Sequence, residues 1–387
     1  MKIHFNSSYH NDYQNLPGAV VLYNPYNDQN LANKKFNSSF IAQVKTKNYA
    51  LGFNSFFQNN ETIYRDNKYL NLQGFLENRY KNQSTGGGFI FSRFIKTETQ
   101  KVFIGTDIKA STLIGTQFSE SPKRININSV FGISKWFTRV KTQGNISHQM
   151  IVDNTPSSTT NISHFSPFIS LAYLPFKDYN FRVRSHYKNT YRLPSFNDLY
   201  YNTIGNSNLE AENASSYNLG LTFGNKIKTI TTETTLDVYT NFIKDKIVAI
   251  PTKNLFNWSM QNIGDVLSQG LDFNFLISIK HDVYTLNFTT NQSFNKSTDV
   301  TDKNSFTYGH QIPYTPKYTS SYTVTIGYLK TNLTTTLLHS GSRYTLNENL
   351  PFNLLNGFID LGIGLNRMFK LKHQKLYVFK GVEPQLR

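Results

Sequence analysis

A two-residue repeat in hydrophobicity runs through most of the 387 residues and limits the folds that this chain can adopt. For example, Leu271, Phe273 and Phe275 are apolar, whereas Asp272 and Asn274 between them are polar. Successive side chains of a β-strand point to opposite faces of its sheet, so a period of two predicts strands rather than helices. On this pattern we expect about 15 or 16 strands. They lie near residues 17–24, 38–47, 54–64, 88–96, 101–111, 127–137, 139–151, 164–174, 181–187, 215–223, 234–242, 271–277, 284–292, 322–328, 332–339 and 359–365.

The lengths of these segments favour strands that cross a membrane. Many exceed the roughly 5–6 residues of ordinary strands and approach the roughly 9–11 that a tilted strand needs to cross a bilayer. Their polar residues suit a water-filled interior better than a dry core. We therefore predict an all-β fold, an antiparallel transmembrane β-barrel in which Phe273 and Phe275 face lipid and Asp272 and Asn274 face the lumen. A secreted or surface β-rich adhesin, with sheets solvated on one face, is the alternative.

The connections between the segments alternate in length, as they do in outer-membrane barrels. We expect tight turns at 175–180, 224–229 and 329–332, and long loops near 192–214, 244–269, 293–318 and 340–356. The loop at 192–214 should lie outside the cell, because Pro194 blocks ladder pairing and the Gly205–Asn206 pair favours a turn.

The composition excludes several classes of protein. Aromatic residues make up 15% of the chain, which is too many for a disordered basic tail. The absence of cysteine excludes disulfides, cysteine-ligated metals and a thiol nucleophile. The mean hydropathy of −0.44 is compatible with a barrel, in which only every second residue faces lipid. The net charge is +16, but the basic residues are singletons, which argues against nucleic acid and for contact with outer-membrane lipid and anionic lipopolysaccharide.

No pattern typical of catalysis or of cofactor binding is present. The nine histidines lack the spacing of metal ligands, so we expect no metal site and no cofactor. Asp198, Glu210 and Glu212 lie within one loop, and a carboxylate pair can serve a glycosidase. A structural role in a turn explains them more simply, and we expect that the protein is not an enzyme.

Two short motifs around the loop at 192–214 resemble the paired boxes of TonB-dependent outer-membrane receptors, Phe-Arg-Ala-Pro followed by Asn-Pro-Asn-Leu-x-Pro-Glu. The matching residues are Arg192, Pro194, Asn206, Asn208, Leu209 and Glu212. The resemblance continues at 238–247, at 262–272, which includes Gly270, and at 313–317. More weakly, residues 16–27 are similar to cobalamin receptors of the family. The resemblance implies structural roles for these residues and leaves the ligand-binding residues unknown.

The resemblance also implies a function and a location. Family members take up scarce nutrients such as cobalamin or siderophores through the outer membrane of Gram-negative bacteria, driven by TonB, which acts on a plug domain inside a 22-stranded barrel. We expect residues 1–387 to form a partial barrel or an open curved sheet, without signal peptide or plug. The ends suggest a fragment of a longer receptor or a non-functional gene fragment.

Overall fold

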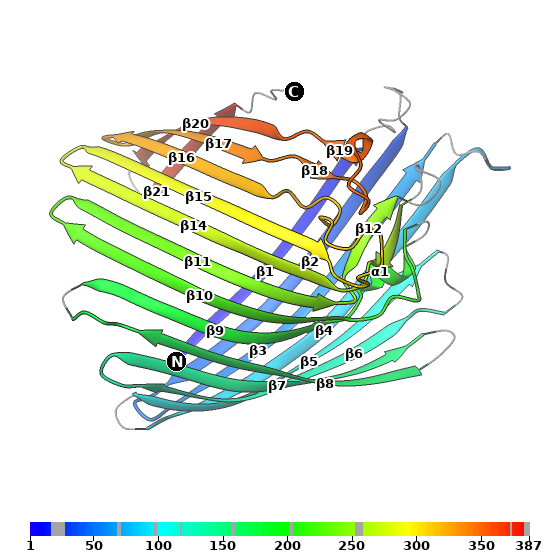
Figure 1. Ribbon diagram of the computed structural model, residues 1–387, viewed down its shortest axis with the longest axis horizontal. Helices are drawn as coiled ribbons and strands as arrows, with labels where there is room; N and C mark the ends of the chain where they lie inside the picture. Colours follow the sequence, from blue (N-terminus) through cyan, green and yellow to red (C-terminus); the bar gives the residue numbers. More distant parts are fainter. Residues whose placement is uncertain are drawn as a thin grey trace.

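One large antiparallel sheet accounts for most of the structure. The computed structural model describes residues 1–16, 28–67, 71–95, 99–116, 118, 120–155, 159–177, 179–201, 204–251, 258–371 and 374–382. The sheet contains 17 strands, and each pairs with the next strand of the sheet along the chain (Figure 1). These strands are β1 (Lys2–Asn15), β2 (Gln29–Lys45), β3 (Tyr49–Asp66), β4 (Leu76–Ile95), β5 (Gln100–Gly115), β6 (Lys123–Trp136), β7 (Val140–Asn154), β8 (Thr159–Tyr173), β9 (Asn180–Arg192), β10 (Glu212–Ile227), β11 (Ile230–Lys244), β14 (Val266–His281), β15 (Tyr284–Asp299), β16 (Tyr318–Tyr328), β17 (Thr331–Ser340), β20 (Phe358–Leu371) and β21 (Gln374–Val382).

The remaining elements are short and lie in the connections. They are α1 (Phe196–Tyr200), the strand pair β12 (Ile247–Pro251) and β13 (Trp258–Asn262), the strand pair β18 (Arg343–Tyr344) and β19 (Leu354–Leu355), and a 3-10 turn at Pro351–Asn353. Neither helical segment in the described part of the chain is long and apolar enough for a membrane crossing.

The predicted all-β antiparallel fold is confirmed, and the strands of the large sheet exceed the expected number by one. The sequence pattern misses β1, because polar residues such as Asn6, Ser7 and Ser8 interrupt its alternation. It also misses β21, which follows the last predicted segment. The strand predicted at 17–24 falls outside the described residues, as does most of the 16–27 segment that is similar to cobalamin receptors.

The sheet curls, so that its early strands lie behind its late ones (Figure 1). Among the described residues no ladder joins β1 to β20 or β21, so the pairing follows the chain from one edge strand to the other without closing. The curved open sheet allowed for in the sequence prediction is therefore the form that this structure takes.

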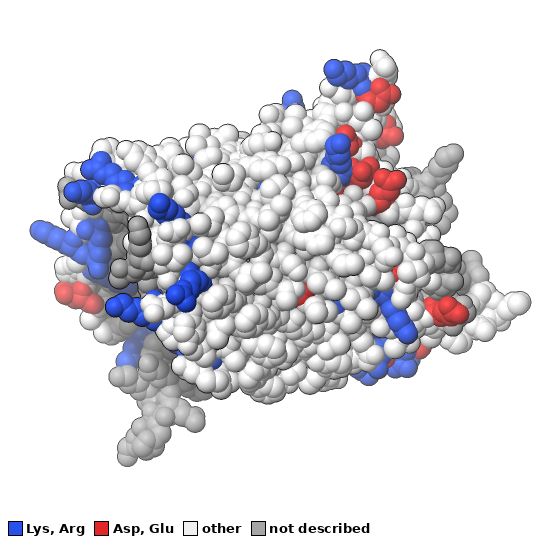
Figure 2. Space-filling view, turned by 90° about the horizontal axis from the view of Figure 1, so that it is seen from below, with Lys and Arg blue, Asp and Glu red and all other residues white. Residues whose placement is uncertain are grey.

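The two faces of the sheet differ in polarity. Leu219 on β10 and Val238 on β11 are 55% and 49% exposed, and they lie in register with Leu271 on β14. From Leu271 to Ile279, every second residue of β14 is apolar, and Phe273 and Phe275 belong to this set. Seen from below, the surface carries most of its charged residues near its two ends, with a largely uncharged band between them (Figure 2). The band suits the hydrocarbon layer of a membrane.

The opposite face carries the polar partners of the same strands. Arg184 on β9 forms an ion pair with Asp237 on β11 at 2.9 Å. Asp272 lies in register with Asp237 and accepts a hydrogen bond from Ser293 at 2.6 Å. Asn274 donates to Thr235 at 3.0 Å. The structure thus assigns Asp272 and Asn274 to the polar face.

The seam between β8 and β9 is shorter than its neighbours. The two strands pair only from Phe168–Tyr173 against Val183–Lys188, whereas β9 pairs with β10 along its whole length. Beyond the last pair, side chains replace the backbone ladder. His164 Nε2 lies 3.0 Å from Asn189 Oδ1, and the His164 and Tyr191 rings stack with centroids 4.2 Å apart.

Candidate functional site

The two ends of the sheet are built differently, as the alternation of connection lengths predicts. We call one the turn end, because two-residue turns close it at 228–229, 282–283 and 329–330. We call the other the loop end. Its longer connections are residues 193–211, 245–265, 300–317 and 341–357.

An ion pair closes the top of β9 and β10 at the loop end. Arg192 Nε donates to Glu212 Oε2 at 2.8 Å, and Arg192 Nη2 donates to Glu212 Oε1 at 3.2 Å. Glu212 is only 7% exposed. Burial by itself raises the pKa of its carboxyl group, but the hydrogen bonds from Arg192 and from the backbone N–H of Ile247, with the charge of Lys246, outweigh burial and lower the pKa below its ordinary value.

Glu212 also ties the next loop to this pair. The backbone N–H of Ile247 donates to Glu212 Oε1 at 2.7 Å, and Lys246 Nζ lies 3.2 Å from the same oxygen. One buried carboxylate therefore holds three groups, one from the end of β9 and two from the connection 245–265. Such an anchor is strong because removing it leaves buried donors without an acceptor.

Backbone and amide contacts join loops 193–211 and 245–265 further out. Asn206 Nδ2 donates to the carbonyl of Met260 at 3.0 Å, and its Oδ1 accepts from the backbone N–H of Asn208 at 3.0 Å. Asn262 Oδ1 accepts from the N–H of Glu210 at 2.9 Å, and Asn262 Nδ2 donates to the carbonyl of Asp245 at 2.6 Å. The two loops form a single layer.

Loop 193–211 begins with a capped turn of helix. The Ser195 hydroxyl accepts from the N–H of Asp198 at 3.2 Å, and the Asp198 carboxylate accepts from the N–H of Ser195 at 2.8 Å. This reciprocal pair is a capping box, which satisfies donors at the start of a helix. The capping box fixes the direction of the chain at Phe196, where the helical turn begins.

Aromatic residues of this loop reach strands early in the chain. Phe196 is buried against Tyr80 of β4 and Leu113 of β5. The ring of Tyr201 stacks on Tyr80 with centroids 4.3 Å apart. Arg124 of β6 lies over the Phe196 ring, 5.1 Å from its centroid. The loop therefore crosses the concave side and joins the late strands to the early ones.

A second ion pair secures that crossing. Arg124 donates to both carboxylate oxygens of Asp153 at 2.6 Å, and its Nη1 donates to the carbonyl of Pro194 at 2.8 Å. Both side chains of the pair are 13% exposed. Arg124 and Asp153 lie directly opposite each other in the β6–β7 ladder, whereas the contact with Pro194 of a distant loop has no signal in the sequence.

Asp299 connects the other two long loops. Its carboxylate accepts hydrogen bonds from the hydroxyl groups of Thr301 and Thr307 at 2.6 and 2.8 Å, and from Asn347 Nδ2 at 2.8 Å. Burial by itself raises the pKa of Asp299, but these bonds, with one from the backbone of Thr301, outweigh it and lower the pKa. Asp299 thus joins loops 300–317 and 341–357 through one buried carboxylate.

A cavity of about 920 Å³ lies beneath loop 193–211. Its lining mixes charged, aromatic and amide side chains, among them Arg124, Asp153, Tyr191, Tyr200 and Lys244. This mixture of ring faces and charges of both signs suits a polar ligand with both ring and charged groups. We take this cavity as the candidate binding site.

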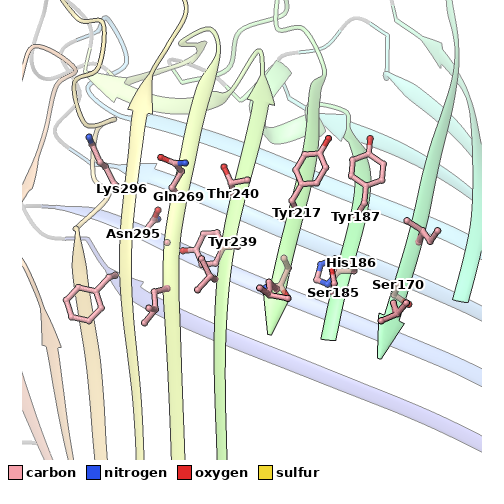
Figure 3. A pocket seen from close by; sticks show the side chains of 18 of the residues that line it. Ser170, Ser185, His186, Tyr187, Tyr217, Tyr239, Thr240, Gln269, Asn295 and Lys296 are labelled. Carbon is pink, nitrogen blue, oxygen red and sulfur yellow. The ribbon is translucent and has the colours of Figure 1, made fainter. Parts of the chain in front are cut away.

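A larger hollow of about 1250 Å³ has a different character (Figure 3). Tyr187, Tyr217, Thr240, Gln269 and Lys296 form one row across five neighbouring strands, and they lie in register. Towards the turn end the lining becomes apolar, with Leu219, Val238 and Leu271. Because this hollow opens on the apolar face, the row marks the limit of the uncharged band at the loop end.

The residues predicted from the two motifs lie together, whereas Gly270, predicted from the stretch 262–272, lies elsewhere. Arg192, Pro194, Asn206, Asn208, Leu209 and Glu212 all belong to loop 193–211 or the strand ends that flank it. Gly270 lies in β14, where an added Cβ would collide with the Tyr239 hydroxyl and the Phe294 carbonyl. The contacts of these residues are compatible with structural roles, which stay predictions.

Neither metal binding nor acid–base chemistry finds support at these residues. In the described ranges no three His, Cys, Asp or Glu side chains gather in a way that would hold a metal ion. A glycosidase acid needs a raised pKa, whereas that of Glu212 is lowered. The Glu212 carboxylate is engaged by Arg192 and Lys246.

Residues 3–363 match the family described as TonB dependent receptor-like, beta-barrel. Among solved structures, the chain is similar to the FrpB iron transporter from Neisseria meningitidis (TM-score 0.67, 12% identity, 94% of this chain and 62% of that one). It is also similar to the ferric citrate transporter FecA (TM-score 0.71, 12% identity, 98% and 62%).

A third similar structure is BauA, the ferric preacinetobactin receptor from Acinetobacter baumannii (TM-score 0.69, 10% identity, 98% of this chain and 65% of that one). The chain thus spans less than two thirds of the length of these structures. No curated protein matches the sequence.

Proposed function

Because this chain belongs to the family of TonB dependent receptor-like β-barrels, we propose that it forms barrel strands of an outer-membrane receptor that takes up a scarce nutrient. The observation that carries the proposal is the family match over residues 3–363, together with a sheet whose strands have an apolar outer band and a layered loop end. Receptors of this family are transporters rather than enzymes.

We propose a ferric chelate of the siderophore class as the nutrient. Similar structures include an iron transporter, a ferric citrate transporter and a ferric preacinetobactin receptor, and this supports the class without identifying the compound. The cavity beneath loop 193–211 offers the rings of Tyr191 and Tyr200 and the charge of Lys244 to such a chelate. No feature of the described residues favours cobalamin.

In this proposal the main role of the motif residues is to hold the loop end in shape, although Pro194, Asn208 and Leu209 also lie in the wall of the cavity. Arg192 and Glu212 would fix the end of the β9–β10 pair, and Asn206 would fix loop 193–211 against Met260. Pro194 would present its carbonyl to Arg124. Their contacts with other protein groups support this role, since an engaged donor or acceptor is not available to a ligand.

The partners follow from the family. TonB would supply the driving force through a plug domain, and the described residues form only the sheet and its loops, so the plug would lie elsewhere. Lipopolysaccharide would surround the loop end in the outer leaflet, with the 192–214 loop outside the cell. These partners remain proposals, as does the fragment status of residues 1–387.

Uptake by the native cells tests the function. We expect that deleting the coding sequence lowers uptake of a radiolabelled ferric siderophore or of ferric citrate, and that restoring it recovers uptake only when TonB is present. Uptake of radiolabelled cobalamin in the same cells serves as the control and should not change.

Two outcomes would contradict parts of the proposal. A loss of cobalamin uptake with normal iron uptake would keep the receptor but overturn the ferric chelate. Normal uptake of all these nutrients would favour a non-functional gene fragment, and cell adhesion lost in the same deletion would favour the surface adhesin.

A further inference from the structure

Cations recur in the connections of the turn end. The turn end also includes the connections 46–48, 137–139 and 174–179. Of the turns that the structure describes there, five contain a Lys or Arg, and each of these side chains is exposed. We call this set the basic collar: Lys47, Arg139, Lys177, Lys228 and Lys330. The described turn residues include one carboxylate, that of Asp282, and the sequence places Lys96, Glu98, Asp178 and Lys372 in turn segments outside the described residues.

At the loop end, several cationic side chains form ion pairs with carboxylates. Arg65 pairs with Glu77, Arg79 with Glu61, and Arg124 with Asp153, at 2.6 to 2.7 Å. Between described residues no ion pair joins a collar side chain to a carboxylate. The positive charge of the collar is therefore directed to the solvent, while much of that at the loop end is neutralised within the protein.

Aromatic side chains lie beside the collar. Phe137, Phe176, Tyr284 and Tyr328 are 48–57% exposed and lie in the turns or at the strand ends next to them. Lys135 Nζ lies 4.6 Å from the centroid of the Phe137 ring. Aromatic rings with Lys or Arg next to an apolar band are typical of the headgroup layer of a membrane.

We propose that the basic collar binds anionic phospholipid headgroups in the leaflet that surrounds the turn end. The proposal rests on the membrane-spanning barrel proposed above. Two observations favour a lipid over an acidic protein. The collar residues lie in five turns between β2 and β17 at one end of the sheet, so the collar spreads along a rim rather than forming a compact patch (Figure 1). It also borders the uncharged band directly, where headgroup phosphates lie.

The proposal is tested by measuring whether lipid stabilises the protein that the native cells produce. The protein is extracted from outer membranes into a nonionic detergent, and its melting temperature is followed while short-chain phosphatidylglycerol is added. We expect phosphatidylglycerol to raise the melting temperature at low salt. Phosphatidylcholine of equal chain length and inorganic phosphate at equal concentration should not, and high salt should weaken the effect.

A matched pair of variants assigns the effect to the collar. In the first, Lys47→Gln, Lys228→Gln and Lys330→Gln remove three collar charges; in the second, Lys123→Gln, Lys303→Gln and Lys317→Gln remove three exposed charges of the loop end. We expect the first to raise the half-saturating concentration of phosphatidylglycerol by roughly tenfold or more, and the second to leave it within about twofold.

The outcomes separate the sources of the effect. Equal shifts in both variants would show a general effect of net charge and would overturn the proposal. Equal stabilisation by phosphatidylcholine, or stabilisation by inorganic phosphate, would also overturn it. If deletion leaves nutrient uptake unchanged while phosphatidylglycerol still acts through the collar, the proposed nutrient fails and the lipid site stands.

Discussion

The loop end and the turn end close the same strands by opposite means. At the loop end, buried carboxylates such as Glu212 and Asp299 gather donors from two connections, and Phe196 packs on strands that precede it by more than 80 residues. At the turn end, three of the connections need only two residues, and Lys228, Asp282 and Leu329 adopt φ angles of 50–55° as the first residue of these turns. Long-range contacts thus shape one end and local backbone geometry the other.

The largest effect should come from the uncharged band that separates the two ends. Phe273→Arg would place a charge in the apolar layer and should reduce assembly by about 2–4 kcal/mol. Asn274→Arg, one residue away on the polar face, should be tolerated. The measurement is the heat-modifiable fraction recovered from outer membranes, and equal losses in the two variants would contradict the assignment of faces.

Loss of the Glu212 carboxylate should be the next largest effect and should be confined to the loop end. Glu212→Ala leaves Arg192, Lys246 and the N–H of Ile247 without this acceptor, at a cost of about 1.5–3 kcal/mol. We expect faster proteolysis within loop 193–211 on intact cells. The exposed Glu210 provides the control, because Glu210→Ala keeps the backbone contacts to Asn262. Faster cleavage of the Glu212→Ala variant at the turn end would contradict an effect confined to the loop end.

Acid should loosen the loop end before the turn end. The pKa of Glu212 lies below its ordinary value of 4.5, and that of Asp299 lies below 3.8. Their stabilisation is therefore complete above those ordinary values and is lost as the pH falls through the lowered values of the folded state. Limited proteolysis between pH 6 and pH 3 by an acid-active protease, at about one-unit steps, should cut loops 193–211 and 300–317 first. The Glu212→Gln variant should show less acid dependence in loop 193–211.

The smallest effect should be a gain in stability from a substitution at the turn end. Leu329 is 67% exposed and has a φ of 55°, a conformation that glycine adopts without steric cost. Leu329→Gly should stabilise the turn by about 0.5–1 kcal/mol. Leu329→Ala retains the steric penalty and serves as the control in thermal unfolding. A similar gain with alanine would trace the effect to the loss of an exposed apolar side chain.

The sequence predicts the turn end and the faces of the sheet better than the loop end. Alternation along a strand is a local property, so Phe273 and Asp272 can be assigned to opposite faces from neighbouring residues alone. The motif around Arg192 and Glu212 predicts where a special loop lies. The contacts of Arg124 with Pro194 and of Tyr80 with Tyr201 escape prediction, because they depend on how far the sheet curls and bring together residues about 70 to 120 positions apart.

The short seam between β8 and β9 has a mechanical consequence. When a force acts along two paired strands, all of their hydrogen-bonded pairs share the load. When a force pulls the strands apart from one end, the pairs break one after another. The ladder from Phe168 to Tyr173 is already parted towards the loop end, where the His164–Asn189 contact bridges the gap. Lateral tension would therefore part the backbone pairs along this line first, and the contacts of Phe196 and Pro194 with β4–β6 would still hold β1–β8 and β9–β21 together.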